Sequence, residues 1–369
     1  MSANRKAFTL IELMVVVVII VMLAALASTA YFGAMQSARE VRTIGIIAKL
    51  DAAISDIYET YEFRFEHIED ALDDKVVSGV DSSRTRFNND ISLMSESEIT
   101  ELKRKFMYDL MRMEMPSIRQ EVEDDPKDIG VVAGKNYKLA DSAVRQVYQS
   151  ILADPKVTST PTSLGTSSAE LLYLIIANLD PEALENFTAS EIGDTDNNGL
   201  SEFIDGWGRP IAFLRFAPGF TDTDRQPDIK KVDSSLTAKK FNLRDFNVID
   251  TLDGITVTTP NSTITKAKDL IINQWQDPFD PDMLNGESWF LYPVVVSAGR
   301  DGKFGIVMAR KASGAETPVS LYDPFSEGAL VGSPYDPDED EDKSGALADS
   351  PEYDTSRHND NIHNHTNFR

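Results

Sequence analysis

The residues best suited to chemistry form one run, Asp194-Thr195-Asp196-Asn197-Asn198-Gly199-Leu200-Ser201-Glu202-Phe203-Ile204-Asp205. Oxygen-bearing groups recur in it at the spacing of a calcium loop, and Gly199 stands where such a loop turns sharply. The predicted ligands are Asp194, Asp196, Asn198, the carbonyl of Leu200, Glu202 and Asp205. A polar turn without metal has a similar composition, so both interpretations stay open.

A second chemically unusual residue is Glu12, the only acid near a long apolar run. No residue from Leu13 to Met35 is charged, and a helix of that length spans the roughly 30 Å of a bilayer core. A carboxylate at the edge of such a span is costly unless something pairs with it, which makes Glu12 a functional candidate. Arg5 and Lys6 precede the run and favour a cytoplasmic N terminus, with most of the chain outside.

Two interpretations explain this N terminus. An ordinary secretory signal would be cleaved after Ala25-Leu26-Ala27, which leaves Glu12 unexplained. The segment Ala7–Leu13 instead resembles the class III signal of type IV pilins and type II secretion pseudopilins. That resemblance implies cleavage by prepilin peptidase between Ala7 and Phe8, N-methylation of Phe8, and a role for Glu12 in assembly. The family usually has Gly where this chain has Ala7.

Two later segments resemble major pseudopilins. Asp205-Gly206-Trp207-Gly208-Arg209-Pro210 is similar to their D-x-W-G-x-P segment, and Ser297–Gly305 is similar to their S-A-G-x-D-G-x-x-G turn. In that family the C-terminal loops help to bind a structural calcium ion. Taken by themselves, Asp301-Gly302 predicts a hairpin turn and Trp207 a core aromatic residue.

The composition excludes several classes of function. The chain has 369 residues and a formal net charge of −24, which disfavours nucleic-acid binding because phosphates need a cationic face. It has no cysteine, so an exported domain must be held together by packing, metal ions or assembly. Of the four histidines, three lie in the polar tail, and no catalytic constellation or phosphate loop is present, so no enzyme activity is predicted.

The pattern of apolar residues along the chain predicts an α+β fold. In this fold a long pilin-like N-terminal helix carries a globular domain with a helical insertion and a small antiparallel sheet. In the insertion, one predicted helix opens at Ser95–Glu98 and stops near Pro116, and a second covers 137–152. Candidate strands lie at 211–216, 255–259, 290–297 and 306–309. The predicted regions are a leader (1–7), a long helix (8–65, with 8–35 in the membrane or filament core), a mostly helical insertion (66–165), a C-terminal pilin-like domain (166–333) and an acidic, disordered tail (334–369).

The resemblance implies a structural pseudopilin in the bacterial inner membrane, single-pass, with its globular domain on the periplasmic side. Its expected partners are prepilin peptidase, other pilin or pseudopilin subunits, the inner-membrane assembly platform and membrane lipid, with Ca²⁺ as a structural cofactor. Two alternatives remain. One is a type IV pilin of an adhesion or motility filament, and the other is a secreted calcium-binding protein with an ordinary cleaved signal.

Overall fold

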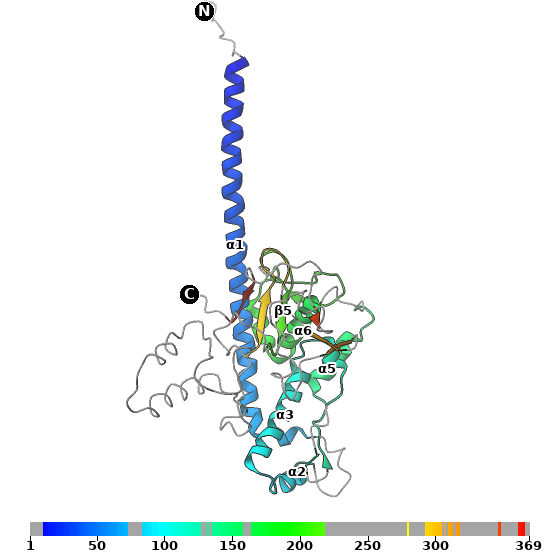
Figure 1. Ribbon diagram of the computed structural model, residues 1–369. Coiled ribbons are helices and arrows are strands. Elements are labelled where there is room, and N and C mark those ends of the chain that lie inside the picture. Colours follow the sequence, from blue (N-terminus) through cyan, green and yellow to red (C-terminus); the bar gives the residue numbers. More distant parts are fainter. Residues whose placement is uncertain are drawn as a thin grey trace, which may run out of the picture.

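A computed structural model of the chain describes residues 10–72, 83–126, 131–132, 135–157, 164–217, 279, 292–304, 306, 309–312, 315–317, 346–347 and 361–365. One long helix stands out from a globular domain with helices and small antiparallel sheets, which confirms the predicted fold class (Figure 1). The helices are α1 (Leu10–Glu66), η1 (Ile68–Ala71), α2 (Ser83–Ile91), α3 (Glu96–Glu114), α4 (Arg119–Glu123), α5 (Ala143–Leu152), α6 (Leu164–Leu179) and η2 (Pro181–Asn186), where η denotes a 3₁₀ helix.

The described strands are short. They are β1 (Val131–Val132), β2 (Lys135–Asn136), β3 (Ile192–Gly193), β4 (Glu202–Phe203), β5 (Ile211–Leu214), β6 (Val294–Ser297), β7 (Ala309–Ala312), β8 (Ala315–Thr317), β9 (Ala346–Leu347) and β10 (Ile362–His363). All pairings between them are antiparallel, and β6 lies between β10 and β5 in the sheet that packs on α1.

Helix α1 has two halves with different surroundings. At about 1.5 Å per residue its length is roughly 85 Å. Its buried residues begin only at Thr43, and its most apolar stretch is entirely exposed and long enough to cross a membrane. Ser28 and Thr29 donate their hydroxyl hydrogens to the carbonyls of Ala24 and Ala25 (2.8 and 2.7 Å), so the polar atoms in this stretch are satisfied within the helix.

The central sheet is buried on both faces, which explains why β5 and β6 are continuous apolar runs. Ile211, Phe213 and Val295 join the main core with α1, α3 and α6. The alternate residues form a second, smaller core on the other face: Ala212, Leu214, Val294 and Val296 with Ala217, Ala298, Phe304 and Ile306. The predicted strands at 211–216 and 290–297 are therefore present, in shorter form, while 255–259 lies outside the described residues.

The segment predicted as a helical insertion contains α2 to α5, together with the two-residue strands β1 and β2. Helix α3 begins where the sequence predicts, because Ser95 and Glu98 form a reciprocal capping box. The insertion is tied to the sheet by Arg215, which makes a buried ion pair with Glu121 (2.5 Å). The boundaries of the five predicted regions stay predictions.

One short part of the predicted disordered tail is ordered, and for residues 361–365 the expectation of disorder was wrong. Ile362 and His363 pair with β6, which has an open edge opposite β5. Asn364 accepts a hydrogen bond from the Val295 N–H (2.9 Å) and donates to the Asp51 carboxylate of α1 (2.8 Å). His363 and His365 are buried, so specific backbone partners outweigh the polar composition of the segment.

Candidate functional sites: the exposed helix and a buried acidic cluster

The exposed half of α1 is the first candidate site. Every described residue from Leu10 to Met35 is exposed, and Leu10 is 77% exposed. Glu12 lies in the first turn of the described helix, among these apolar side chains. The cleavage residues Ala7 and Phe8 lie outside the described residues. An apolar surface of this extent requires lipid or another protein to cover it.

The loop that precedes β4 is the second candidate site, and its backbone is shaped by its own acids. The Asp194 carboxylate accepts hydrogen bonds from the backbone N–H groups of Asn198 (3.0 Å) and Gly199 (2.9 Å). Asn197 and Gly199 adopt positive φ values of 58° and 95°, which turns the chain sharply. The predicted turn around Gly199 is therefore present.

Three carboxylates gather beside this loop. Oxygen atoms of Glu170, Asp196 and Glu202 all lie within 4.8 Å of one another, and both glutamates are buried. Asp196 and Glu202 were predicted from the loop spacing, but Glu170 comes from α6 and was missed. It is the only charged residue in α6, and that isolation was the signal available in the sequence. We call Glu170, Asp196 and Glu202 the acidic cluster.

The acidic cluster holds more negative charge than its surroundings neutralise. Burial raises the pKa of Glu202 to about 7, and the nearby carboxylates of Asp196, Glu170 and Asp194 add to this effect. Burial also raises the pKa of Glu170, although Arg119 donates a hydrogen bond to its carboxylate (2.6 Å). A bound cation would therefore lower the cost of ionising these groups.

The donor set of the acidic cluster consists of carboxylate oxygens, which suits a hard cation such as Ca²⁺. The predicted ligand Asn198 has a different role here. Its amide nitrogen donates to Glu170 (2.5 Å) and Asp196 (3.2 Å), and its oxygen accepts from the Leu200 N–H (2.9 Å). Leu200 lies in the same loop with its side chain buried. The acidic cluster can thus hold a metal ion through three carboxylates, with Asp194 nearby.

The structure does not bring the predicted ligand Asp205 to the acidic cluster. Its carboxylate accepts hydrogen bonds from the N–H groups of Trp207 (2.8 Å) and Arg209 (3.0 Å) and from the Ser297 hydroxyl (2.7 Å). The local spacing rule placed Asp205 in the loop because it could not include Ser297, which is distant in sequence. Asp205 instead joins the two segments that resemble pseudopilins.

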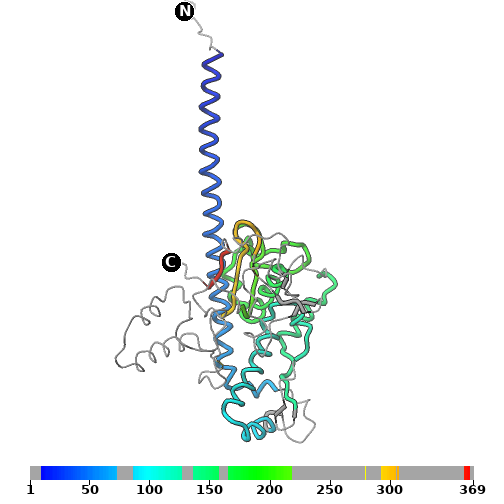
Figure 2. Tube along the Cα trace, viewed as in Figure 1, coloured from blue at the N-terminus to red at the C-terminus, as the bar shows by residue number. Residues whose placement is uncertain are grey.

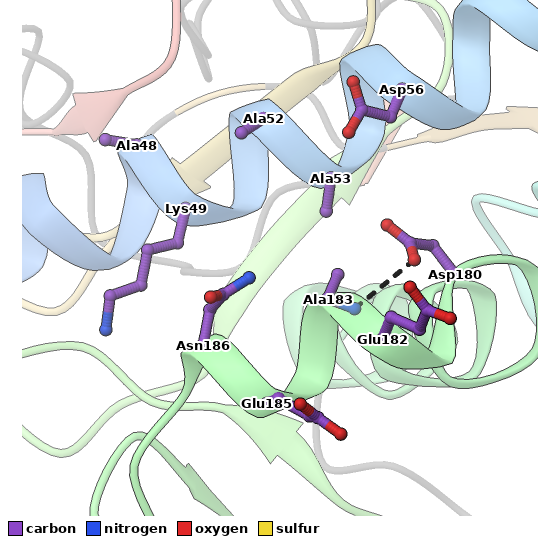
Figure 3. Close-up of a pocket in the computed structure, with 10 residues that line it drawn as sticks. All are labelled: Ala48, Lys49, Ala52, Ala53, Asp56, Asp180, Glu182, Ala183, Glu185 and Asn186. Atoms are coloured by element: carbon purple, nitrogen blue, oxygen red, sulfur yellow. Dashed lines mark hydrogen bonds between the residues drawn. The ribbon is translucent and has the colours of Figure 1, made fainter.

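A cleft of about 720 Å³ lies between α1 and η2 (Figure 3). Its lining combines alanines with several carboxylates. The lining residues are Ala48, Lys49, Ala52, Ala53, Asp56, Asp180, Glu182, Ala183, Glu185 and Asn186. Asp180 is occupied in capping η2, since it accepts from the Ala183 N–H (3.3 Å). This lining offers no nucleophile paired with a base, so the cleft gives no basis for a catalytic function.

Comparison with known proteins bears on the N terminus. The family model described as the prokaryotic N-terminal methylation motif matches residues 2–28. The comparison with curated proteins gives no match, and neither does the comparison with solved structures. The matched residues include the predicted cleavage position, Glu12 and most of the exposed apolar stretch of α1. The chain therefore carries the class III signal that is typical of type IV pilins and pseudopilins.

Proposed function

We propose that this protein is a structural subunit of a type II secretion-type filament, a pseudopilin that works by assembly and catalyses no reaction. The observation that carries the proposal is the exposed half of α1, an apolar surface with a class III signal at its start and no cover among the described residues. Such a helix can be held in a bilayer first and then packed against the same helix of other subunits. Prepilin peptidase and the assembly platform of the inner membrane are the partners that this route requires.

Glu12 gives the assembly its register. Cleavage between Ala7 and Phe8 creates a charged amino terminus one helical turn from Glu12, and in a filament the Glu12 carboxylate of one subunit pairs with the amino terminus of the next. Both charges are then buried together. Removing one partner leaves the other buried alone, at a cost of about 3–5 kcal/mol. A packing of two subunits in which the Glu12 carboxylate does not meet the neighbouring amino terminus is therefore disfavoured.

The test has two arms on the full chain. Intact-mass analysis of the membrane-extracted protein should find N-methylated Phe8 as the first residue. A first residue at Ser28 would establish the secretory alternative instead. Glu12→Ala should be processed and inserted normally but should be absent from cross-linked oligomers, whereas Glu12→Asp keeps the charge and should retain part of the assembly. Normal oligomers of Glu12→Ala would refute the pairing role.

The choice of a secretion-type filament over an adhesive or motility type IV pilus rests on the segments at 205–210 and 297–305. Their resemblance to major pseudopilins is supported by the hydrogen bond between Asp205 and Ser297, which joins the two segments to each other. Deleting the gene should therefore stop the export of a secreted enzyme and leave surface motility intact. Loss of motility with normal export would favour the type IV pilus.

We further propose that the acidic cluster binds a structural Ca²⁺ ion. The ligands would be Glu170, Asp196 and Glu202, with Asp194 beside them. The ion would fasten the loop before β4 to α6, and so would rigidify the part of the domain that leads into β5. This assignment keeps two of the ligands predicted from the loop, Asp196 and Glu202, and adds Glu170. Asp194 lies beside the site, and the other predicted ligands, Asn198, the Leu200 carbonyl and Asp205, are not part of it.

A further inference from the structure

We infer that the end of the globular domain nearest the exposed half of α1 is a docking face for anionic phospholipid headgroups. The basic residues of this face, which we call the basic collar, are Arg39, Arg42, Arg209, Arg300 and Lys303. The inference rests on the proposed membrane anchoring and names the lipid class and the residues that would bind it. It concerns the subunit before it enters a filament.

The position of the basic collar follows from the length of α1. If Met35 ends the apolar span, Arg39 and Arg42 lie about 6 and 10 Å beyond it along the helix axis. The headgroup layer extends roughly 5–8 Å from the hydrocarbon core on each side. Long arginine side chains can reach back along the helix over a few ångströms. Arg39 therefore lies at headgroup level. Arg42, whose guanidinium donates to the Ser190 carbonyl oxygen (2.7 Å) and hydroxyl (3.0 Å), lies just beyond that level.

The turn after β4 is fixed to the same part of α1. The Gly206 N–H donates to the Thr43 hydroxyl (2.9 Å), and the Trp207 ring N–H donates to the Gln36 side chain (2.9 Å). Gly206 lies so close to α1 that a Cβ there would collide with the Arg39 carbonyl oxygen. This contact holds the globular domain against the helix within a turn or two of the apolar span.

Arg209 then carries the basic collar into the turn after β6. Its guanidinium donates to the carbonyl oxygens of Gly299 (2.9 Å) and Arg300 (3.3 Å) and packs directly on Gly302. Arg300 is exposed. Figures 1 and 2 show this turn at the end of the domain that faces the exposed half of α1. Arg300 and Lys303 therefore extend the basic surface sideways from the helix.

The charge of this face is opposite to that of the chain. Glu40 and Asp301 lie beside the basic collar in sequence and are exposed. Asp205 is buried, and the buried Glu191 is paired with Lys49. The five basic residues therefore outnumber these acids, whereas the whole chain carries a net charge of −24. Basic residues after a membrane span oppose its insertion with that flank outside. Their presence here needs a compensating interaction, and the negative surface potential of anionic lipid supplies one, because it attracts basic residues near the surface.

Aromatic side chains lie beside the basic collar, near the end of the apolar span. Tyr31 and Phe32 are 62% and 65% exposed, and their rings contact each other edge to face at 6.0 Å between centroids. Trp207 is half-buried, and its ring N–H donates to Gln36, the residue that follows Met35 in α1. Tyrosine and tryptophan concentrate at the headgroup region of membranes. Tyr31 and Phe32 therefore lie near the end of the apolar span, and the basic collar follows it. This is the order of a membrane interface and argues against a soluble protein partner at this face.

The test is hydrogen exchange on the full-length protein in nanodiscs. Backbone amides at 298–304 should exchange about fivefold more slowly in phosphatidylcholine discs containing phosphatidylglycerol than in pure phosphatidylcholine discs. Arg300→Gln combined with Lys303→Gln should remove this difference. Arg104→Gln combined with Lys105→Gln, which removes the same charge from α3, should keep it. High salt should abolish the protection, and inorganic phosphate added to phosphatidylcholine discs should not reproduce it.

Equal exchange in the two lipid compositions would overturn the inference, as would equal loss of protection in the α3 control. Protection by free phosphate alone would assign the face to soluble anions and would also overturn it. The proposed function fails in a different way, because a protein cleaved after Ala27 would not be retained in the discs. If amide exchange is equal in the two lipid compositions while the protein stays in the discs, the inference of a lipid-binding face is refuted and the filament proposal is unaffected.

Discussion

The globular domain buries charge in two places and balances it differently in each. Between the insertion and β5, Arg215 makes a two-pronged contact with Glu121 (2.5 and 3.0 Å), and the two side chains are 2% and 1% exposed. In the acidic cluster, Glu170, Asp196 and Glu202 converge, and Arg119 pairs with Glu170 alone among them. The first site is neutral as a pair, whereas the second retains negative charge.

This difference separates a structural contact from a binding site. A buried carboxylate with its own guanidinium has its desolvation cost offset within the chain, so it needs nothing from solution. Carboxylates that raise one another's pKa gain most from an external cation, which the raised pKa of Glu202 reflects. The four predictions that follow test this distinction.

The largest effect is expected from breaking the neutral pair. Arg215→Met leaves the Glu121 carboxylate buried with the Ser117 N–H as its remaining described donor (2.6 Å). The free energy of unfolding should fall by about 3–5 kcal/mol, measured by urea unfolding of the full chain in detergent. Arg215→Met combined with Glu121→Leu should recover most of this loss. A loss below about 1 kcal/mol in the single variant would show that the pair is not a structural contact.

Calcium should stabilise the acidic cluster and leave the neutral pair unchanged. Extracellular calcium sites have dissociation constants of about 0.1–1 mM. At a hundredfold excess over that constant, binding to the folded state adds about 2.7 kcal/mol, seen as a higher Tm than in chelator. Asp196→Ala should remove the response, and Asp301→Ala should keep it. The reverse pattern would move the site to the turn after β6.

In chelator, the acidic cluster should make stability depend on pH. The pKa of Glu202 is raised from 4.5 to about 7, so between these values the folded state holds a proton that the unfolded state releases. The free energy of unfolding should therefore fall as pH rises through this window, by at most about 1.4 kcal/mol per pH unit. Saturating calcium should weaken or reverse this slope, and Glu202→Gln should flatten it. An unchanged slope in Glu202→Gln would assign the titration elsewhere.

The smallest effect is expected at a pair that solvent reaches. Lys49 contacts Glu191 at 3.0 Å, and its side chain is 34% exposed. Lys49→Met should change the free energy of unfolding by less than about 1 kcal/mol, because exposed ion pairs are weak. The same urea titration used for Arg215→Met provides the measurement. A cost similar to that of Arg215→Met would show that burial does not distinguish the two pairs.

Local patterns in the sequence predicted the helices well. The apolar run and the spacing after it indicated α1, and the Ser95–Glu98 capping box indicated the start of α3. These features depend on residues three or four positions apart, which a sequence displays directly. The predicted helix at 137–152 begins only at Ala143, because Leu139 forms an antiparallel β-bridge with Leu72 and the Ala140 N–H donates to the Ala71 carbonyl oxygen (2.7 Å).

The candidate site was only partly predictable, because it depends on contacts between distant residues. Asp196 and Glu202 lie at the predicted spacing, but Glu170 reaches them from another element and Asp205 turns to Ser297. The composition of 361–365 predicted disorder, since it does not reveal that Asn364 has matching partners on α1 and β6. The N-terminal signal was predictable in full as a motif because it is read as a linear sequence.

The strand at Ile362–His363 also sets an order in time. Asn364 bonds to Asp51 across 313 positions of sequence, so this contact closes only after nearly all of the intervening chain has been synthesised. By then α1 has long been available for insertion into the membrane. In the proposed membrane route, α1 would therefore be inserted before the central sheet is complete, because contacts of such long range form slowly. A pseudopilin that follows this proposed route would thus be anchored first and folded last.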